Sequence, residues 1–221
     1  AGDALTDADT NVAVGVSALG GDTLGSSSVA IGSSALRLQN FTTATDVFNV
    51  AIGRAAGENV TTGTHNTLIG GISGGNLTTG ASNVAVGYNS LGTEDVGQHN
   101  VAIGRDALAT QNTATAANIY NTAVGSSAGA EITTGVDNTI IGGLAGDALT
   151  DADYNVAVGK SALSADTLGS ASTATGYAAL ASQNFTTATD SFNTAVGQYA
   201  GAGVTTGVNN TLIGALAGDA L

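Results

Sequence analysis

The sequence predicts an all-β chain folded as a parallel β-solenoid, in which short strands of successive coils stack on one another. Three observations predict this fold. A five-residue motif ending in glycine recurs twelve times, it recurs with a regular 17-residue or 21-residue step, and side chains within it alternate between two faces. A repeat of this length is one structural unit that buries its apolar side chains by stacking on its neighbours.

The motif reads Asn, Val or Thr, a small or aliphatic residue, Val or Ile, and Gly, as in Asn11 to Gly15. The steps between its glycines run 17, 21, 17 and 17 and then repeat, which gives a 72-residue super-repeat. We interpret residues 1–221 as a single continuous solenoid of twelve coils. The super-repeats are 1–72, 73–144 and 145–216. The repeat glycines are Gly15, Gly32, Gly53, Gly70, Gly87, Gly104, Gly125, Gly142, Gly159, Gly176, Gly197 and Gly214.

The strand of each coil is expected in the three residues before the repeat glycine. The Val or Thr and the Val or Ile share one face, while the Asn and the middle residue share the other, because strand side chains alternate. Ser28 and Ser172 replace the Asn in two coils. Stacked amides can donate to one neighbour and accept from the next, so a structural ladder is predicted. Its members are Asn11, Asn49, Asn66, Asn83, Asn100, Asn121, Asn138, Asn155, Asn193 and Asn210.

The remaining parts of the coil follow from the glycine. It is expected at a turn with positive φ, or where another backbone approaches closely. Ala or Ser always stands three positions later, followed by Leu or Gly as at Leu19 and Gly57, and we predict a second short strand there. The four additional positions of each 21-residue step fall in stretches such as Arg37 to Phe48 and predict a protruding loop. Helices are disfavoured, since each of the 33 glycines would cost about 1 kcal/mol in a helix interior.

Composition excludes several classes of protein. The chain contains no cysteine, so disulfides, thiolate metal sites and cysteine nucleophiles are absent. No continuous apolar run is long enough to suggest a membrane span. The formal net charge of -13 would repel a nucleic acid. A soluble, folded repeat protein remains.

No catalytic constellation and no cofactor site emerges from the sequence, and we expect a protein that is not an enzyme. The best chemical candidates are Asp7 and Asp9, repeated as Asp151 and Asp153, because oxygen ligands at alternate positions can hold calcium. The required glycine and bidentate glutamate do not follow, so a solvated turn is the favoured interpretation and calcium the alternative.

One position, five before the repeat glycine, carries both histidines, His65 and His99, and the aromatic residues Phe48, Tyr120 and Phe192. We interpret the histidines as residues of a tolerant rim. The aromatic residues are expected to pack between coils or chains, with a ligand platform as the alternative.

Threonine offers a competing function. Thr-Thr-Gly turns recur at 61–63, 78–80, 133–135 and 205–207 and raise the distant alternative of an ice-binding solenoid. Adjacent threonines point to opposite faces, which argues against it.

The segments Ser28 to Gly32, Asn49 to Gly53 and Asn100 to Gly104 resemble the SVAIG-type repeat of YadA-like heads of trimeric autotransporter adhesins. Similar repeats occur in fibrous phage tail proteins. The resemblance implies a left-handed parallel β-roll, three chains around one axis, a bacterial surface location and adhesion to a receptor or matrix. The coil here is longer than in the adhesin heads, and its 21-residue step is regular.

We therefore expect a structural or adhesive extracellular fibre, with a phage tail-fibre shaft on a virion as the alternative. Each coil buries few and small apolar side chains, so it gains stability if further copies cover another face. The expected partner is the chain itself, as a homo-oligomer, a trimer by resemblance, or a head-to-tail filament. Residues 217–221 repeat the sequence of residues 1–5, which predicts the start of a further repeat.

Overall fold

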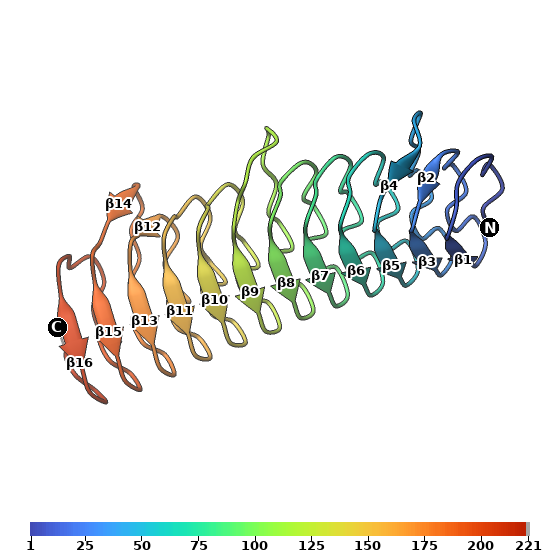
Figure 1. Ribbon diagram of the computed structural model, residues 1–221. Helices are drawn as coiled ribbons and strands as arrows, with labels where there is room; N and C mark the ends of the chain where they lie inside the picture. Colours follow the sequence, from blue (N-terminus) through green and yellow to red (C-terminus); the bar gives the residue numbers. More distant parts are fainter. Residues whose placement is uncertain (220–221) are drawn as a thin grey trace. The chain divides into compact units, whose positions relative to one another are not determined.

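The computed structural model describes residues 1–219, and in that range it consists of strands and turns without a helix. The predicted parallel β-solenoid is confirmed (Figure 1). The chain divides into two compact units, one formed by residues 1–106 and 112–118, the other by residues 107–111 and 119 onward. A single continuous solenoid over 1–221 stays a prediction. Of the predicted further repeat at 217–221, Ala220 and Leu221 lie outside the described residues.

The first unit stacks six three-residue strands, one for each coil. Neighbouring strands are parallel and pair in equivalent positions, so that Ala30 lies opposite Ala51 and Ile31 opposite Ile52. Each motif therefore meets the same motif in the next coil. The strands are β1 (Val12–Val14), β3 (Val29–Ile31), β5 (Val50–Ile52), β6 (Thr67–Ile69), β7 (Val84–Val86) and β8 (Val101–Ile103).

The second unit repeats this arrangement. Its strands also pair in parallel without slippage, as Ile140 with Ala157 and Ala174 with Ala195 show. The strands are β9 (Thr122–Val124), β10 (Thr139–Ile141), β11 (Val156–Val158), β13 (Thr173–Thr175), β15 (Thr194–Val196) and β16 (Thr211–Ile213).

The 21-residue steps form longer loops. In the first unit, β2 (Gly25–Ser26) pairs with β4 (Thr45–Asp46), and Gln98 forms a parallel bridge with Asn118. The loops next to β4 and at 112–118 project from the same side of this unit, as the 21-residue spacing predicts (Figure 1). In the second unit, β12 (Gly169–Ser170) pairs with β14 (Thr189–Asp190).

The second strand predicted after the repeat glycine is wrong. This segment is a run of turns, because its residues alternate between ordinary and left-handed backbone conformations: φ is 57° at Ser17 and 50° at Leu19. A strand requires an extended backbone at every residue. Short i to i+3 hydrogen bonds form within the segment, as from the Ala18 N–H to the Gly15 carbonyl, and other N–H groups bond to the next coil, as from Leu19 to the Ala35 carbonyl.

The core lies on the face that carries the Asn and the middle strand residue. The middle residues Ala51 and Leu68 are fully buried, and so are the flanking Asn49 and Asn66. Glycines after the strand create room for the larger middle residue, since a side chain at Gly57 would lie 2.7 Å from Cδ1 of Leu68. Small and large residues therefore interlock between coils.

The repeat glycine meets both conditions expected of it. Gly53 has a φ of 138°, and a side chain there would overlap the carbonyl oxygen of Gly70 in the next coil. The stacking distance between coils thus requires glycine at this corner.

Candidate functional site

The outward face of the strands is the most extended surface feature of each unit. The first and third residues of the three-residue strands point away from the core and are half-buried or exposed. Ile31, Ile52 and Ile103 are 36%, 37% and 38% exposed although their strands are paired. We call these outward positions of a unit its sheet face.

The sheet face has a uniform chemistry. The two sheet faces together have twenty-four positions, which hold seventeen Val or Ile and seven Thr, without a charged residue. In the first unit all but Thr67 are Val or Ile. On soluble proteins in general, large contiguous apolar patches are found at interaction sites. The strip that the sheet face forms follows the strands, so it repeats at the strand spacing of about 4.8 Å.

The Asn ladder lies on the core side of the strands, opposite the sheet face, and links successive coils. Oδ1 of Asn66 accepts from the backbone N–H of Asn83 at 3.0 Å, and Nδ2 of Asn66 donates to the Gly80 carbonyl at 2.9 Å. Asn49 and Asn83 make the same two kinds of bond. The ladder thus runs through the backbone of the following coil as well as from amide to amide.

Buried carboxylates hold the 21-residue steps, and sequence reasoning missed them. Asp22 is fully buried and has no basic partner among the described residues. It accepts from Gln39 Nε2 at 2.5 Å and from the N–H groups of Gly25 and Phe41 at 3.1 and 3.2 Å. Gln39 in turn accepts from Asn49. Donors of this kind compensate for the burial of the charge.

The same cluster recurs in the other super-repeats. Asp166 accepts from Gln183 at 2.6 Å, and the buried Glu94 accepts from the Gly97 N–H and the Thr113 hydroxyl. The acids recur with the 72-residue period, as do Gln39, Gln111 and Gln183. This spacing was available in the sequence and would have identified the cluster as a structural one.

The aromatic and histidine position lies at the corner before the strand. Phe48 and His65 have left-handed φ values of 55° and 59°, and their rings pack with centroids 5.4 Å apart. His99, Tyr120 and Phe192 share this conformation. Phe48 and Phe192 remain 51% and 57% exposed. Packing between coils is therefore present for Phe48, while the outer ring surfaces stay accessible.

The calcium candidates are spread over exposed turns. Asp151 accepts from the Thr134 hydroxyl and Asp153 from the Val136 N–H, each at 2.7 Å, and Asp7 and Asp9 are exposed. Among residues 1–219 no group of three or more His, Asp or Glu side chains is placed to hold a metal ion. The favoured solvated turn and the calcium alternative both stay predictions.

The threonine turns serve the stacking of coils. The hydroxyl groups of Thr61 and Thr78 donate to the carbonyls of Thr78 and Asp95 in the following coil at 3.1 and 3.4 Å. The second threonines, such as Thr62 and Thr134, are exposed, and the ice-binding alternative stays a prediction.

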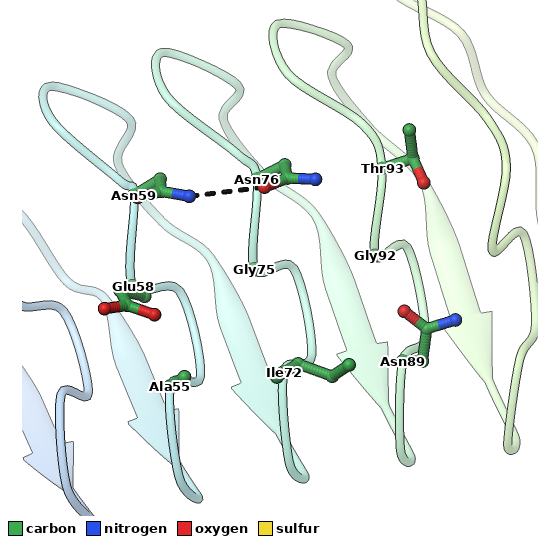
Figure 2. A pocket seen from close by; sticks show the side chains of 9 residues that line it. All are labelled: Ala55, Glu58, Asn59, Ile72, Gly75, Asn76, Asn89, Gly92 and Thr93. Atoms are coloured by element: carbon green, nitrogen blue, oxygen red, sulfur yellow. Dashed lines mark hydrogen bonds between the residues drawn. The ribbon is translucent and has the colours of Figure 1, made fainter.

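A shallow groove of about 250 Å³ crosses three coils of the first unit. Its residues form three rows (Figure 2): Asn59, Asn76 and Thr93 along one side, Glu58, Gly75 and Gly92 in the middle, and Ala55, Ile72 and Asn89 along the other. All of them follow the repeat glycines, so the groove uses none of the residues of the sheet face.

Comparison with protein-family models, curated proteins and solved structures finds no match to this sequence. Within residues 1–219 there is also no helix with the length and apolarity that a membrane crossing requires. The functional interpretation therefore depends on the geometry of the chain itself.

Proposed function

We propose that this protein is a non-enzymatic structural or adhesive fibre segment that associates with copies of itself through the sheet face. The single observation that carries the proposal is the uncharged strip of half-exposed Val, Ile and Thr across the strands of each unit. Covering it removes apolar surface from water at about 25 cal/mol for each Å².

A second copy of the chain is the partner that best fits this strip. The side chains of the sheet face recur once for each coil, and only a partner with the same period can match them coil after coil. A second sheet face supplies that period, and Val and Ile side chains of two sheets interdigitate well at a distance of about 10 Å. Three chains around one axis, a left-handed turn of the coil and an extracellular or cell-surface location are the further parts of this proposal, and the resemblance to adhesin heads supports them.

The repeated surface would serve a fibre in two ways. Stacked coils provide length, and identical coils present identical contacts, so a receptor or matrix that binds weakly to one coil is held by many. A phage tail-fibre shaft is the alternative with the same physical basis. Electron microscopy of native material separates the two, since threads on a cell surface support the first and short fibres on capsids the second.

The test of self-association is the mass of the full chain in solution. We expect an oligomer at micromolar concentration by light scattering coupled to size exclusion. The triple variant Ile31→Lys, Ile52→Lys, Ile103→Lys should be monomeric, because it places three charges into the strip. Leu38→Lys is the matched control, because Leu38 is 39% exposed but lies outside the sheet face. A monomeric wild type, or an oligomer that survives the triple substitution with unchanged circular dichroism, contradicts the proposal.

A further inference from the structure

The groove in the first unit exists because two glycines stand where most other coils carry side chains. Five positions after the repeat glycine, the solenoid accommodates Arg37, Glu58 and Asp147, whereas Gly75 and Gly92 leave this row open. The fold therefore tolerates a side chain in this row, and the openings at Gly75 and Gly92 lie in two neighbouring coils.

Hydrogen-bonding groups face the opening from both sides. Asn59 donates to Oδ1 of Asn76 at 3.2 Å, which leaves Oδ1 of Asn59 as an acceptor and Nδ2 of Asn76 as a donor (Figure 2). On the opposite side, Asn89 uses its Nδ2 to donate to Asp106 at 3.0 Å. Its Oδ1 lies where a side chain of Gly92 would be and so points into the hollow.

The groove is electrically balanced and partly apolar. Its single carboxylate, Glu58, is paired with Arg37 at 2.8 Å, and the other side chains that line it are neutral. The side chain of Ile72 forms an apolar wall beside the open row (Figure 2). This combination disfavours ions of either sign and favours a neutral ligand that has hydroxyl groups and an apolar face.

The amides are not required by the solenoid. In the second super-repeat Glu131 stands in place of Asn59, and in the third Gly203 stands in place of Asn59 and Ala148 in place of Asn76. The structural Asn ladder, in contrast, keeps its Asn in ten of twelve coils. A row of amides beside an open row of glycines therefore has a local purpose.

We propose that this groove is a saccharide-binding site that takes one pyranose ring. Asn59, Asn76, Asn89 and Thr93 would bind ring hydroxyls, since an amide both donates and accepts, and Ile72 would contact the C–H face of the ring. The volume of about 250 Å³ is below the usual range for drug-sized ligands, which fits a ligand of one ring. A shallow site for such a small ligand is expected to have a dissociation constant on the order of 1 mM.

Saturation-transfer NMR on the full chain tests this proposal, because it detects weak ligands of large and oligomeric proteins. The probes are methyl glycosides of glucose, galactose, mannose and N-acetylglucosamine, with tetraglycine as a peptide probe. We expect saturation transfer to at least one glycoside and at least a tenfold weaker affinity for the double variant Asn59→Ala, Asn76→Ala.

Two further variants locate the binding. Gly75→Gln fills the open row, where Arg37, Glu58 and Asp147 show that side chains are accommodated, and should abolish saturation transfer. Ala202→Gln changes a residue of the same row in the third super-repeat, outside the groove, and should leave saturation transfer unchanged. Circular dichroism checks that both variants fold. The proposal is overturned if no glycoside receives saturation, if Gly75→Gln binds as well as the wild type, or if tetraglycine alone binds and Gly75→Gln abolishes that binding.

Discussion

The side chain of Leu68 occupies the space that a side chain at Gly57 would need, since an added Cβ would lie 2.7 Å from its Cδ1. Leu68 is the middle residue of β6, where most strands have Ala, and Gly57 stands where the preceding coil has Leu36. Leu36 itself adopts a left-handed φ of 49°, so the backbone of this corner accepts leucine. A large side chain at one of these two positions is thus combined with a small residue at the other, a relationship that we call volume exchange.

This exchange predicts a strong coupling between the two sites. Gly57→Leu should lower the free energy of unfolding by about 1 to 3 kcal/mol through overpacking, and Leu68→Ala by about 2 to 5 kcal/mol through the cavity it leaves. The double variant restores the arrangement of the preceding coil and should be more stable than the sum of the single effects by about 1 to 3 kcal/mol. Urea unfolding of the four proteins measures the coupling, and strictly additive effects would disprove the volume exchange.

The Asn ladder predicts a large cost for a single amide. Asn66→Ala removes a buried side chain and leaves the Asn83 N–H and the Gly80 carbonyl without their partner, so we expect a loss of about 3 kcal/mol. Asn76→Ala is the matched control, because Asn76 is exposed and its Oδ1 accepts from the Asn59 amide at the surface. Its stability should change by less than about 0.5 kcal/mol. Equal effects of the two substitutions would contradict a structural role for the ladder.

The strands and the stacking could be predicted because they depend on short-range patterns that recur. Alternation around each repeat glycine separates the Asn face from the Val and Ile face, and the constant spacing fixes which residues stack. The position of Asn66 next to Asn83 in the ladder follows directly from the 17-residue step between them.

The segment after the glycine could not be predicted in the same way. Leu19 is apolar and follows a small residue, a pattern that also fits a strand, but its φ of 50° belongs to a conformation that leucine rarely adopts. Stacking imposes this conformation, because the chain must turn within a short segment to return to the next strand. The conformational preferences of single residues therefore predict a strand here, where the stacking of the coils requires a turn.

The groove was also beyond sequence reasoning. Gly75 and Gly92 look like two more of 33 glycines, and only the stacked coils show that they lie side by side between rows of amides. The buried Asp22, in contrast, has a signal in the sequence, since acids and glutamines recur with the 72-residue period.

The buried carboxylate predicts how the 21-residue step is held. Asp22→Ala should destabilise the chain by about 3 kcal/mol, because Gln39 and the Gly25 and Phe41 N–H groups lose their acceptor inside the core. Asp22→Asn keeps the shape but turns a donor toward the donating Gln39 amide, so it should also destabilise. Asp46→Ala, at an exposed acid of the same loop, should change stability by less than about 0.5 kcal/mol. Hydrogen exchange should rise at residues 40–46 in both Asp22 variants, and unchanged protection there would refute the role of the carboxylate.

Asp147 predicts a pH dependence of stability with a definite sign. Burial raises the pKa of its carboxyl above the ordinary value of 3.8, and the charge of Glu131 raises it further, against a lowering by a backbone hydrogen bond. Its buried Oδ1 accepts no hydrogen bond from the residues that the structure describes.

Because the folded state binds this proton more tightly than the unfolded state, the carboxyl stabilises the fold fully below pH 3.8. This contribution is lost as the pH rises through the raised pKa. Asp147→Asn should therefore be more stable than the wild type at pH 7, by at most about 1 kcal/mol because solvent screens the half-exposed group. Glu131→Gln should lower the pKa of Asp147, which NMR titration of the carboxyl carbon measures directly. An Asp147 pKa at or below 3.8 in the wild type, or a pKa that Glu131→Gln leaves unchanged, would contradict the assignment.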